Sequence, residues 1–399
     1  MRLMLLSHGY PPTLSGVTLV VQKIARAMAE RGHAVLVVTA SEKHLPYQAE
    51  DQGVHVHRIL GIPNPFWWEG PMPFSLPSTL HRLIDRFQPG VIHTHDNAYQ
   101  GILLSRLRCP PSTRVITSCY TLPSFFTQFT RLGAFETGID NLMWNYYLGN
   151  LNRYQHVVFC TRTHEQAFKA HGLQPATTVI SNGVNIQRYC TEKEVNENIV
   201  ERYHLPPSPR LLSVGRLMKD KRLDLLLKAM RVVCDQMDAH LLVVGRGSEH
   251  QRLRSLIKKL ELEQNIHLLG YLPEGDLPAI YRACDLFTIP SMVEVQSIPA
   301  LQAVATGIPI VAANSAALPE LVHHGVNGYL VDPTDEAEYG GAILHILGNA
   351  AERSRMGWAS LEIAAEHDET VTFVKYEQLY QGLLEPPAGK GESKTRLVA

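Results

Sequence analysis

The sequence predicts an α/β protein of two facing, Rossmann-like, doubly wound domains. The chain has 399 residues, enough for two domains of ordinary size. Short, continuously apolar runs, typical of strands buried on both faces, alternate with amphipathic helical segments along the chain. This rhythm pauses once, at a polar stretch near the middle, and then restarts. Two such domains placed face to face form a cleft at the carboxyl ends of their strands, where open α/β sheets bind ligands.

The first domain is expected to span residues 1–182. Its first helix has apolar side chains on one broad face, and Gly32 ends that helix. The expected strands are residues 2–7, 34–39, 54–59, 90–94, 115–118, 156–160 and 177–180. The expected helices are residues 16–31, 77–87 and 163–171. Strands that alternate with helices in this way indicate a parallel sheet covered on both faces.

The second domain is expected to span residues 183–370, with a polar stretch at 191–198 near its start. Its expected strands are residues 210–214, 240–244, 266–268, 286–289, 310–312 and 329–331. Its expected helices are residues 223–234, 249–262, 276–283, 298–306 and 336–347. A final helix within residues 371–386 is apolar-periodic and is expected to pack back on the first domain. The polar tail, residues 387–399, is expected to be disordered.

Two stretches rich in aromatic side chains and proline, residues 64–77 and 123–154, break the strand–helix pattern. The first contains Phe66, Trp67 and Trp68. Aromatic loops usually pack under their own domain. The alternative is an apolar binding site or a surface that docks on a membrane.

Composition and charge exclude several classes of protein. The chain is 45% hydrophobic and 19% charged, as in soluble globular proteins, and no apolar run reaches the roughly 18 residues of a spanning helix. We therefore expect a cytoplasmic protein without a signal peptide. Residues 1–185 carry 15 basic and 10 acidic side chains, against 22 and 28 in the remainder. A basic first half favours an anionic surface such as the inner face of a membrane, with ordinary charge scatter as the alternative. No feature points to nucleic acid. The six cysteines contain no C-x-x-C pair, so buried free thiols are expected.

The loop before the first helix, Tyr10–Gly16, joins a strand to a helix. Such a junction directs free backbone N–H groups and the positive end of a helix toward the cleft, where they suit a phosphate. Gly16 allows that phosphate to approach the backbone closely. A glycine in such a turn is more often purely structural. The loop lacks the G-x-G-x-x-G pattern, so an NAD-dependent oxidoreductase is poorly supported.

Two basic residues follow the first strand of the second domain. Arg216 and Lys221 lie five residues apart across a strand–helix turn, so both can hold one diphosphate and stabilise its growing negative charge as it departs. The alternative is a solvated basic loop. Gly245, in the turn after the next strand, is either a close approach to the same ligand or a structural turn.

The most specific motif joins a strand to a helix over residues 290–303. Glu294 lies in the loop, where its carboxylate suits sugar hydroxyls. The backbone N–H groups of Gln296, Ser297 and Ile298 are expected to form a helix N-terminus that suits a phosphate. Gln302 is expected to lie on the same side, within the helix.

Together these motifs resemble a family-four retaining glycosyltransferase of the GT-B fold, over nearly the whole chain. Further matching segments are Arg31–His33, Val91–His95, Ser181–Val184, Ala305–Pro309 and Pro319–Gly328. The resemblance implies a metal-independent hexosyltransferase without a cofactor, with an acceptor-binding first domain and a second domain that binds the nucleoside-diphosphate sugar. It implies that Arg216 and Lys221 hold the donor diphosphate and that Glu294 contacts the transferred sugar. The implied mechanism is front-face displacement, in which the leaving phosphate helps to deprotonate the acceptor.

Three positions depart from the family pattern. The second glutamate, which binds the ribose, is Gln302, and a neutral amide bonds hydroxyls more weakly than a carboxylate. The usual Gly-Gly of the first loop is Ser15-Gly16. A histidine often found after the strand at residues 115–118 is Tyr120, which, like His95, is assigned to the acceptor side. The Glu-x-Gln-Ser form of the fourth motif is similar to bacterial diacylglycerol and phosphatidylinositol sugar transferases, which implies a lipid acceptor and peripheral contact with a membrane.

Two alternatives stay open at this stage. A catalytically weak protein that binds sugar nucleotides or glycans would explain Gln302 and Tyr120, but the retention of Arg216, Lys221 and Glu294 argues against it. A sugar-nucleotide epimerase on the same fold would act on the donor without any acceptor. An assay that omits the acceptor separates the epimerase from a transferase.

Overall fold

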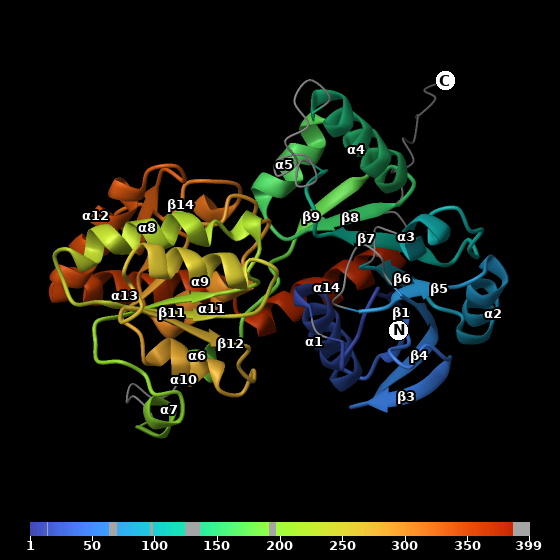
Figure 1. The fold of residues 1–399 in the computed structure, drawn as a ribbon. Helices are drawn as coiled ribbons and strands as arrows, with labels where there is room; N and C mark the ends of the chain where they lie inside the picture. The colour runs from blue at the N-terminus through green and yellow to red at the C-terminus, as the bar shows by residue number, and fades with distance from the viewer. Residues whose placement is uncertain (14, 64–69, 96–98, 124–135, 191–196, 386–399) are drawn as a thin grey trace, which may run out of the picture.

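The computed structural model describes residues 1–13, 15–63, 70–95, 99–123, 136–190 and 197–385. They form two α/β domains, and the last helix returns from the second domain to the first (Figure 1). The predicted fold class is confirmed, because each domain is a largely parallel sheet flanked by helices.

The first domain holds a nine-stranded sheet in the order β3-β4-β2-β1-β6-β7-β8-β9, with β5 paired to β4. The strands are β1 (Arg2–Leu6), β2 (Ala34–Ala40), β3 (Tyr47–Asp51), β4 (Val54–Ile62), β5 (Met72–Phe74), β6 (Val91–Thr94), β7 (Arg114–Cys119), β8 (His156–Phe159) and β9 (Ala176–Val179). The helices are α1 (Gly16–Glu30), α2 (Pro77–Phe87), α3 (Tyr99–Leu104), α4 (Glu136–Leu151) and α5 (Arg162–Ala170). Only the pairs β3–β4 and β4–β5 are antiparallel.

The second domain holds a fully parallel six-stranded sheet in the order β12-β11-β10-β13-β14-β15, which is the Rossmann order 3-2-1-4-5-6. The strands are β10 (Arg210–Val214), β11 (His240–Val244), β12 (Ile266–Gly270), β13 (Leu286–Ile289), β14 (Ile310–Ala313) and β15 (Gly328–Val331). The helices are α6 (Ile186–Cys190), α7 (Glu197–Arg202), α8 (Leu223–Cys234), α9 (His250–Lys259), α10 (Leu277–Arg282), α11 (Ile298–Thr306), α12 (Glu336–Gly348) and α13 (Ala350–Glu366), with the 3₁₀ turns η3 (Lys219–Lys221) and η4 (Leu318–Glu320).

The apolar strands explain why helices cover both faces of the second sheet. Leu211 and Leu212 are adjacent in β10 and both fully buried, yet they belong to separate core clusters on opposite faces. Leu241 and Leu242 in β11 behave in the same way. Each buried leucine contributes about 2 kcal/mol of transfer free energy, so both faces must be covered.

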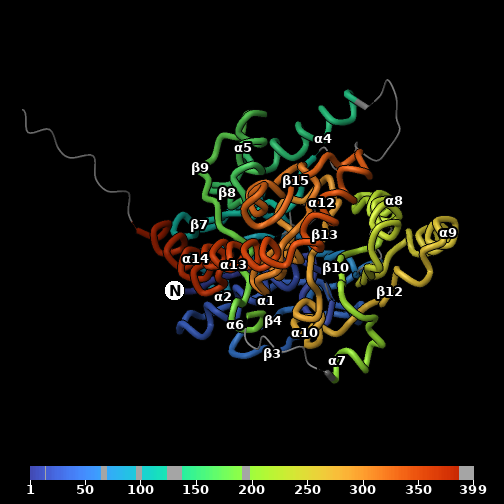
Figure 2. Tube along the Cα trace, turned by 90° about the vertical axis from the view of Figure 1, so that its left-hand side faces the viewer, coloured from blue at the N-terminus to red at the C-terminus, as the bar shows by residue number. Residues whose placement is uncertain are grey.

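The last helix, α14 (Glu369–Leu384), packs on the first domain, beside α1 (Figures 1 and 2). Tyr376 and Tyr380 are buried in the core of that domain. The helix begins two residues earlier than the apolar pattern indicated, because the Asp368 side chain accepts a hydrogen bond from the Thr370 backbone N–H at 2.8 Å.

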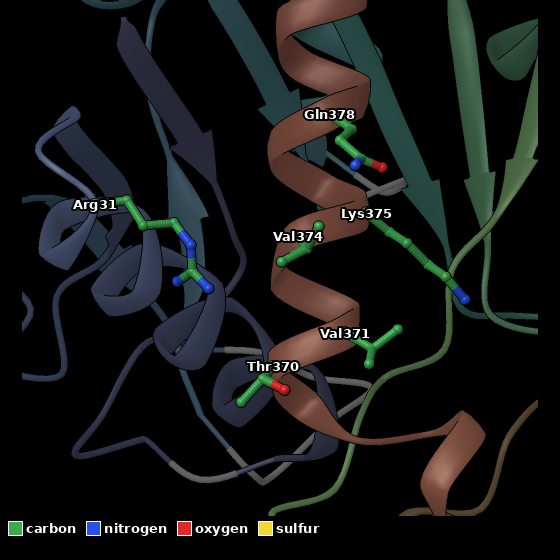
Figure 3. Close-up of a pocket in the computed structure, with 6 residues that line it drawn as sticks. All are labelled: Arg31, Thr370, Val371, Val374, Lys375 and Gln378. Carbon is green, nitrogen blue, oxygen red and sulfur yellow. The ribbon is translucent and has the colours of Figure 1, made fainter.

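A shallow cavity of about 350 Å³ lies where Arg31, at the end of α1, projects toward the first half of α14 (Figure 3). Val371 and Val374 form its apolar part. The guanidinium of Arg31 also forms an ion pair with Glu377 at 3.3 Å. Arg31 follows the end of α1 that lies farthest from Gly16, so this cavity is separate from the loop expected to bind a ligand.

The sequence did not predict β3, β5, α3, α4, α6, α7 and α13. Strand β3 is polar and partly exposed, so it lacks the apolar signal. Helix α4 lies within the second aromatic stretch, where its Trp144 stacks on His171 at 3.6 Å and contacts Phe168 at 5.0 Å. The packing interpretation therefore holds for Trp144, whereas Tyr146 on the same helix is 44% exposed. Phe66, Trp67 and Trp68 lie outside the described residues, as does the tail from residue 386.

Candidate functional site

The topology of each sheet selects the loops that can form a site. In the second domain the connections run in opposite directions from the neighbouring strands β10 and β13, and ligands bind beyond the carboxyl ends of strands at such a switch point. The loops after these strands carry Arg216, Lys221 and Glu294. In the first domain the equivalent neighbours are β1 and β6, which lead to Gly16 and His95.

Lys221 and Glu294, here called the donor pair, lie 73 residues apart in sequence and meet at this switch point. The Lys221 Nζ donates a hydrogen bond to Glu294 Oε1 at 2.6 Å, and Asp220 Oδ2 lies 3.5 Å from the same Nζ. Burial alone would lower the pKa of Lys221, but the carboxylates of Glu294 and Asp220 outweigh it and raise that pKa. Burial alone would raise the pKa of Glu294, but the Lys221 ammonium holds it below its usual value. Both groups therefore stay charged.

Arg216 acts electrostatically on both members of the donor pair. Its guanidinium contributes to lowering the pKa of Glu294 and opposes the raised pKa of Lys221. The residue sits in a loop held by backbone contacts: Leu217 N–H donates to Arg246 O at 2.9 Å. The structure thus brings together the three residues that the sequence predicted as the catalytic set.

Gly245 has a packing explanation in the structure. A Cβ atom placed on Gly245 would lie 1.8 Å from the backbone oxygen of Gly215, and the φ angle of Gly245 is +143°. Any side chain there would push apart the loops after β10 and β11, so Gly245 supports the position of Arg216. A direct contact of Gly245 with a donor stays a prediction.

The N-termini of two helices, one from each domain, point at the same region. Helix α1 begins at Gly16 with Ser15 as N-cap, and α11 begins at Ile298 with Ser297 as N-cap. A Cβ atom on Gly16 would lie 3.5 Å from Ile298 Cδ1, so the two helix starts face each other. Ser15 and Ser297 each cap one N–H of the first turn, and the N–H groups of Gly16 and Ile298 at the two helix starts suit an anion between them.

Gln302 lies within α11, as predicted. Its Oε1 accepts a hydrogen bond from the Tyr281 hydroxyl at 3.1 Å, and the same hydroxyl donates to the Pro299 carbonyl at 3.0 Å. The side chain is therefore held by its own domain.

The region that the sequence analysis assigned to the acceptor contains a group of neutral rings, here called the histidine cluster: His93, His95 and Tyr120. His95 Nδ1 lies 2.9 Å from the Tyr120 hydroxyl, and the His93 and His95 rings are 4.1 Å apart. Burial, assisted by the charge of His8, lowers the pKa of His95 to about 3, so the ring is uncharged near neutral pH. His95 Nε2 is buried and has no hydrogen-bond partner within the described part of the chain. A hydroxyl, which both donates and accepts, can satisfy this nitrogen in either tautomer.

His93 extends this cluster into the core. Its Nε2 lies 2.9 Å from Ser118 Oγ and its Nδ1 lies 2.8 Å from the Tyr380 hydroxyl on α14. The last helix thus supports the histidine cluster. The sequence did not indicate this contact, because it joins residues 287 positions apart.

Contacts between the domains were also missed by the sequence analysis. The Thr161 hydroxyl donates to the Val295 carbonyl at 2.8 Å, and Glu320 accepts hydrogen bonds from the backbone N–H groups that begin α5. The Gln296 side chain forms hydrogen bonds with residues 181 and 182. The sequence pattern had indicated a role only for its backbone N–H. Only the local Glu-x-Gln-Ser pattern drew attention to Gln296, and it gives no indication of a partner 114 residues away.

Two further properties concern the described residues alone. No group of three or more His, Cys, Asp or Glu side chains there is placed to hold a metal ion. None of the helices built from these residues combines the length and the apolar character needed to cross a bilayer.

Both halves of the chain match known families. Residues 14–188 match the model of Glycosyltransferase Family 4, and residues 196–361 match that of Glycosyl transferases group 1. The N-acetyl-alpha-D-glucosaminyl L-malate synthase of Bacillus anthracis is 22% identical, covering 94% of this chain and 95% of that protein. The GDP-mannose-dependent alpha-(1-6)-phosphatidylinositol monomannoside mannosyltransferase of Mycobacterium tuberculosis is 24% identical, covering 90% and 93%. The structure of Anabaena HepE in complex with UDP-glucose has a TM-score of 0.75 at 19% identity, covering 96% of this chain and all of that one.

Proposed function

Because the chain is a glycosyltransferase made of a family 4 domain and a group 1 domain, we propose that it moves a sugar from a nucleoside-diphosphate sugar to an acceptor hydroxyl with retention of configuration. The observation that carries this proposal is the donor pair. Lys221 and Glu294 supply a cation for a diphosphate and a carboxylate for sugar hydroxyls at the switch point of the second sheet.

The chemistry follows from the charge of the leaving group. As the bond between the anomeric carbon and the diphosphate oxygen breaks, negative charge grows on the phosphate, and Lys221 and Arg216 stabilise it. The acceptor oxygen forms its bond on the same face of the sugar, and its proton passes to the leaving phosphate oxygen. These two cations supply the positive charge that the departing diphosphate needs, so the proposed reaction requires no metal ion.

The donor exchanges one partner of Lys221 for another. Without a donor, the Lys221 ammonium is neutralised by Glu294 at 2.6 Å. The diphosphate replaces the carboxylate as the counter-ion of Lys221, which releases Glu294 to accept hydrogen bonds from the sugar. The helix starts at Gly16 and at Gln296–Ile298 donate backbone N–H groups to the phosphates. Gln302 binds the ribose.

We propose a membrane lipid as the acceptor, held on the side of His95 and Tyr120 by a hydroxyl of its head group. The mannosyltransferase relative is named for a phosphatidylinositol monomannoside. The basic excess of residues 1–185 would attract an anionic leaflet. The malate synthase relative is instead named for L-malate, a small molecule. The acceptor test must therefore distinguish a membrane lipid from a small soluble acceptor.

The donor is tested by a thermal-shift screen with UDP, GDP and ADP sugars, followed by transfer assays with the sugars that bind. A ligand that binds only the native state raises the melting temperature. We expect one nucleotide class to stabilise the protein and to support transfer with the anomeric configuration retained. No stabilisation and no turnover with any of the three classes would contradict the proposed function.

The acceptor is tested with vesicles. We expect the protein to sediment with anionic vesicles more than with neutral ones, less so at high salt, and to transfer sugar to phosphatidylinositol in preference to free inositol phosphate or malate. The double substitution Trp67→Ser, Trp68→Ser should weaken sedimentation if these tryptophans enter the bilayer. A protein that stays in the supernatant with anionic vesicles at low salt does not use a membrane acceptor.

A further inference from the structure

The chain crosses between the domains twice, and the two crossings pair with each other. The first crossing is residues 181–184 and the second is residues 367–369. Val184 N–H donates to His367 O at 2.9 Å, and Glu369 N–H donates to Val184 O at 3.0 Å. A Cβ atom on Gly183 would lie 2.9 Å from the Glu369 Cα atom, so the backbones are in close contact. Any change in the relative orientation of the domains must be accommodated at this paired segment.

Gln296 binds the first crossing through its amide group and reaches the second crossing through Ser181. Its Oε1 accepts a hydrogen bond from the Asn182 backbone N–H at 2.7 Å, and its Nε2 donates to Ser181 Oγ at 3.1 Å. Ser181 Oγ in turn lies 2.9 Å from His367 Nδ1. Because burial lowers the pKa of His367, its ring is neutral and its Nδ1 can accept the Ser181 hydroxyl proton. The chain of donors therefore runs from Gln296 to Ser181 to His367.

The same loop, residues 293–297, here called the donor loop, is held at neighbouring positions as well. The Glu294 carbonyl accepts from Ala317 N–H at 3.1 Å within the second domain. The Val295 carbonyl accepts from the Thr161 hydroxyl of the first domain at 2.8 Å. Glu294, Val295 and Gln296 thus contact the second domain, the first domain and the first crossing in turn.

We propose that Gln296 is a positioning residue that couples the orientation of the two domains to the position of the Glu294 carboxylate. The inference rests on the proposed function, since it assigns the coupling to the residue that contacts the sugar. A shift at the crossings moves the amide of Gln296, and Glu294 lies only two residues away in the same loop. The carboxylate reaches the sugar in the correct position only when the acceptor domain is correctly placed.

Glutamine fits this position because one planar group must both accept and donate. The Asn182 N–H needs an acceptor, which is Gln296 Oε1, and Ser181 Oγ accepts a hydrogen bond from Gln296 Nε2. Methionine has nearly the same length but makes neither bond well. Glutamate keeps the acceptor for Asn182 but cannot donate to Ser181, which would have to turn its proton away from His367.

The test is a double-mutant cycle of Gln296→Met and Ser181→Ala, with the exposed Gln251→Met on α9 as the matched control. We expect each single variant at the crossing to lower kcat for transfer about fivefold to tenfold, the scale of one to two hydrogen bonds. The double variant should be no worse than the poorer single variant. The Kd for the nucleoside diphosphate should change less than twofold, because the cations that bind it are untouched. Gln296→Glu should recover part of kcat, and Gln251→Met should match wild type.

The outcomes separate this inference from the proposed function. An unchanged kcat in Gln296→Met would overturn the coupling, and so would losses in kcat that multiply in the double variant. Sugar transfer by the wild-type protein would still support the proposed function in either case. Hydrogen exchange supplies a readout that needs no activity: the Asn182 amide should exchange at least tenfold faster in Gln296→Met than in wild type or Gln251→Met. Equal exchange in all three proteins would overturn the inference even if wild type transfers no sugar.

Discussion

The two domains present opposite chemistry at the region where they meet. The second domain offers charge: the Lys221 ammonium and the Glu294 carboxylate lie 2.6 Å apart and both remain ionised. The first domain offers neutral groups: His95 is held uncharged by burial and is bonded to the Tyr120 hydroxyl. This difference matches the proposed substrates, because a diphosphate gains negative charge during transfer whereas an acceptor hydroxyl must stay neutral until it attacks.

Burial affects these two sets of residues differently because of their neighbours. Lys221 and Glu294 keep their charges in a partly buried setting because each compensates the other. The pKa of His95 falls to about 3 with the nearby charge of His8 adding to the effect of burial. A buried titratable group is therefore charged or neutral according to its partner, and the sequence spacing alone does not reveal that partner.

The largest effect on transfer is expected from removing a cation of the second domain. Lys221→Met should slow transfer by about 2 to 4 kcal/mol in activation free energy, because it removes a cation aimed at the leaving phosphate. Arg216→Ala should act in the same direction. The control is Lys219→Met, an exposed lysine two residues earlier in the same turn, which should keep wild-type kcat. Wild-type turnover in both Lys221→Met and Arg216→Ala would remove these residues from the mechanism.

The buried neutral histidines of the first domain should make the stability of the protein depend on pH. Burial lowers the pKa of His93 well below its usual value, that of His95 to about 3 and that of His164 to about 4, against about 6.5 in the unfolded chain. Below pH 6.5 the unfolded state takes up protons that the folded state does not, so the free energy of unfolding falls as the pH falls. From pH 7.5 to pH 6 the three histidines together should remove about 2 kcal/mol.

This loss should be concentrated in the first domain. Hydrogen exchange at pH 7.5 and pH 6, corrected for the intrinsic rate, should show β6 losing more protection than β11. The triple substitution of His93, His95 and His164 by glutamine is the control and should flatten the difference. Equal losses of protection in β6 and β11 would mean that the first domain is no more sensitive to acid than the second.

The next effect concerns His95 alone. His95→Phe keeps an aromatic ring but removes both ring nitrogens: Nδ1, which is bonded to Tyr120, and Nε2, which is buried without a hydrogen-bond partner among the described residues. Transfer should therefore fall about tenfold, the scale of one buried hydrogen bond. Hydrolysis of the donor without acceptor, and the Kd of the nucleoside diphosphate, should stay within twofold of wild type. A variant that loses donor binding instead would place His95 on the donor side and remove the contrast between the domains.

The sequence predicted the strands of the second domain better than those of the first, and the reason is physical. Strand β10, strand β13 and helix α11 begin and end at the predicted residues, because continuous apolar runs lie between polar or glycine-rich turns. In the first domain, β3 is a partly exposed antiparallel strand whose residues carry no apolar signal. The family resemblance indicated which residues of the site to consider, and the parallel order of the strands explains why they meet.

What the sequence could not predict are contacts between distant parts of the chain. The bond from Gln296 to Asn182 and the bond from His93 to Tyr380 depend on how the domains and the last helix pack. Local spacing contains no information about such partners. The same limit applies to His95, which was placed on the acceptor side by its motif, while its bond to Tyr120 follows from the pairing of β6 with β7.

The smallest effect should come from Gln302, the position that departs from the family pattern. Gln302→Glu replaces a neutral acceptor by a carboxylate, which bonds ribose hydroxyls more strongly, so nucleotide binding should tighten. The gain should be limited to about threefold, within the range of one hydrogen bond, because Oε1 is already engaged by the Tyr281 hydroxyl. Calorimetry with the nucleoside diphosphate measures it, and Gln302→Met, which should weaken binding, is the opposing control. Because Tyr281 can donate to a carboxylate as well as to an amide, the substitution should leave α11 in place. Weaker nucleotide binding in Gln302→Glu would show that this side chain does not hold the ribose. Glu294 would then be the last residue of this loop and helix with a charge-dependent role in donor binding.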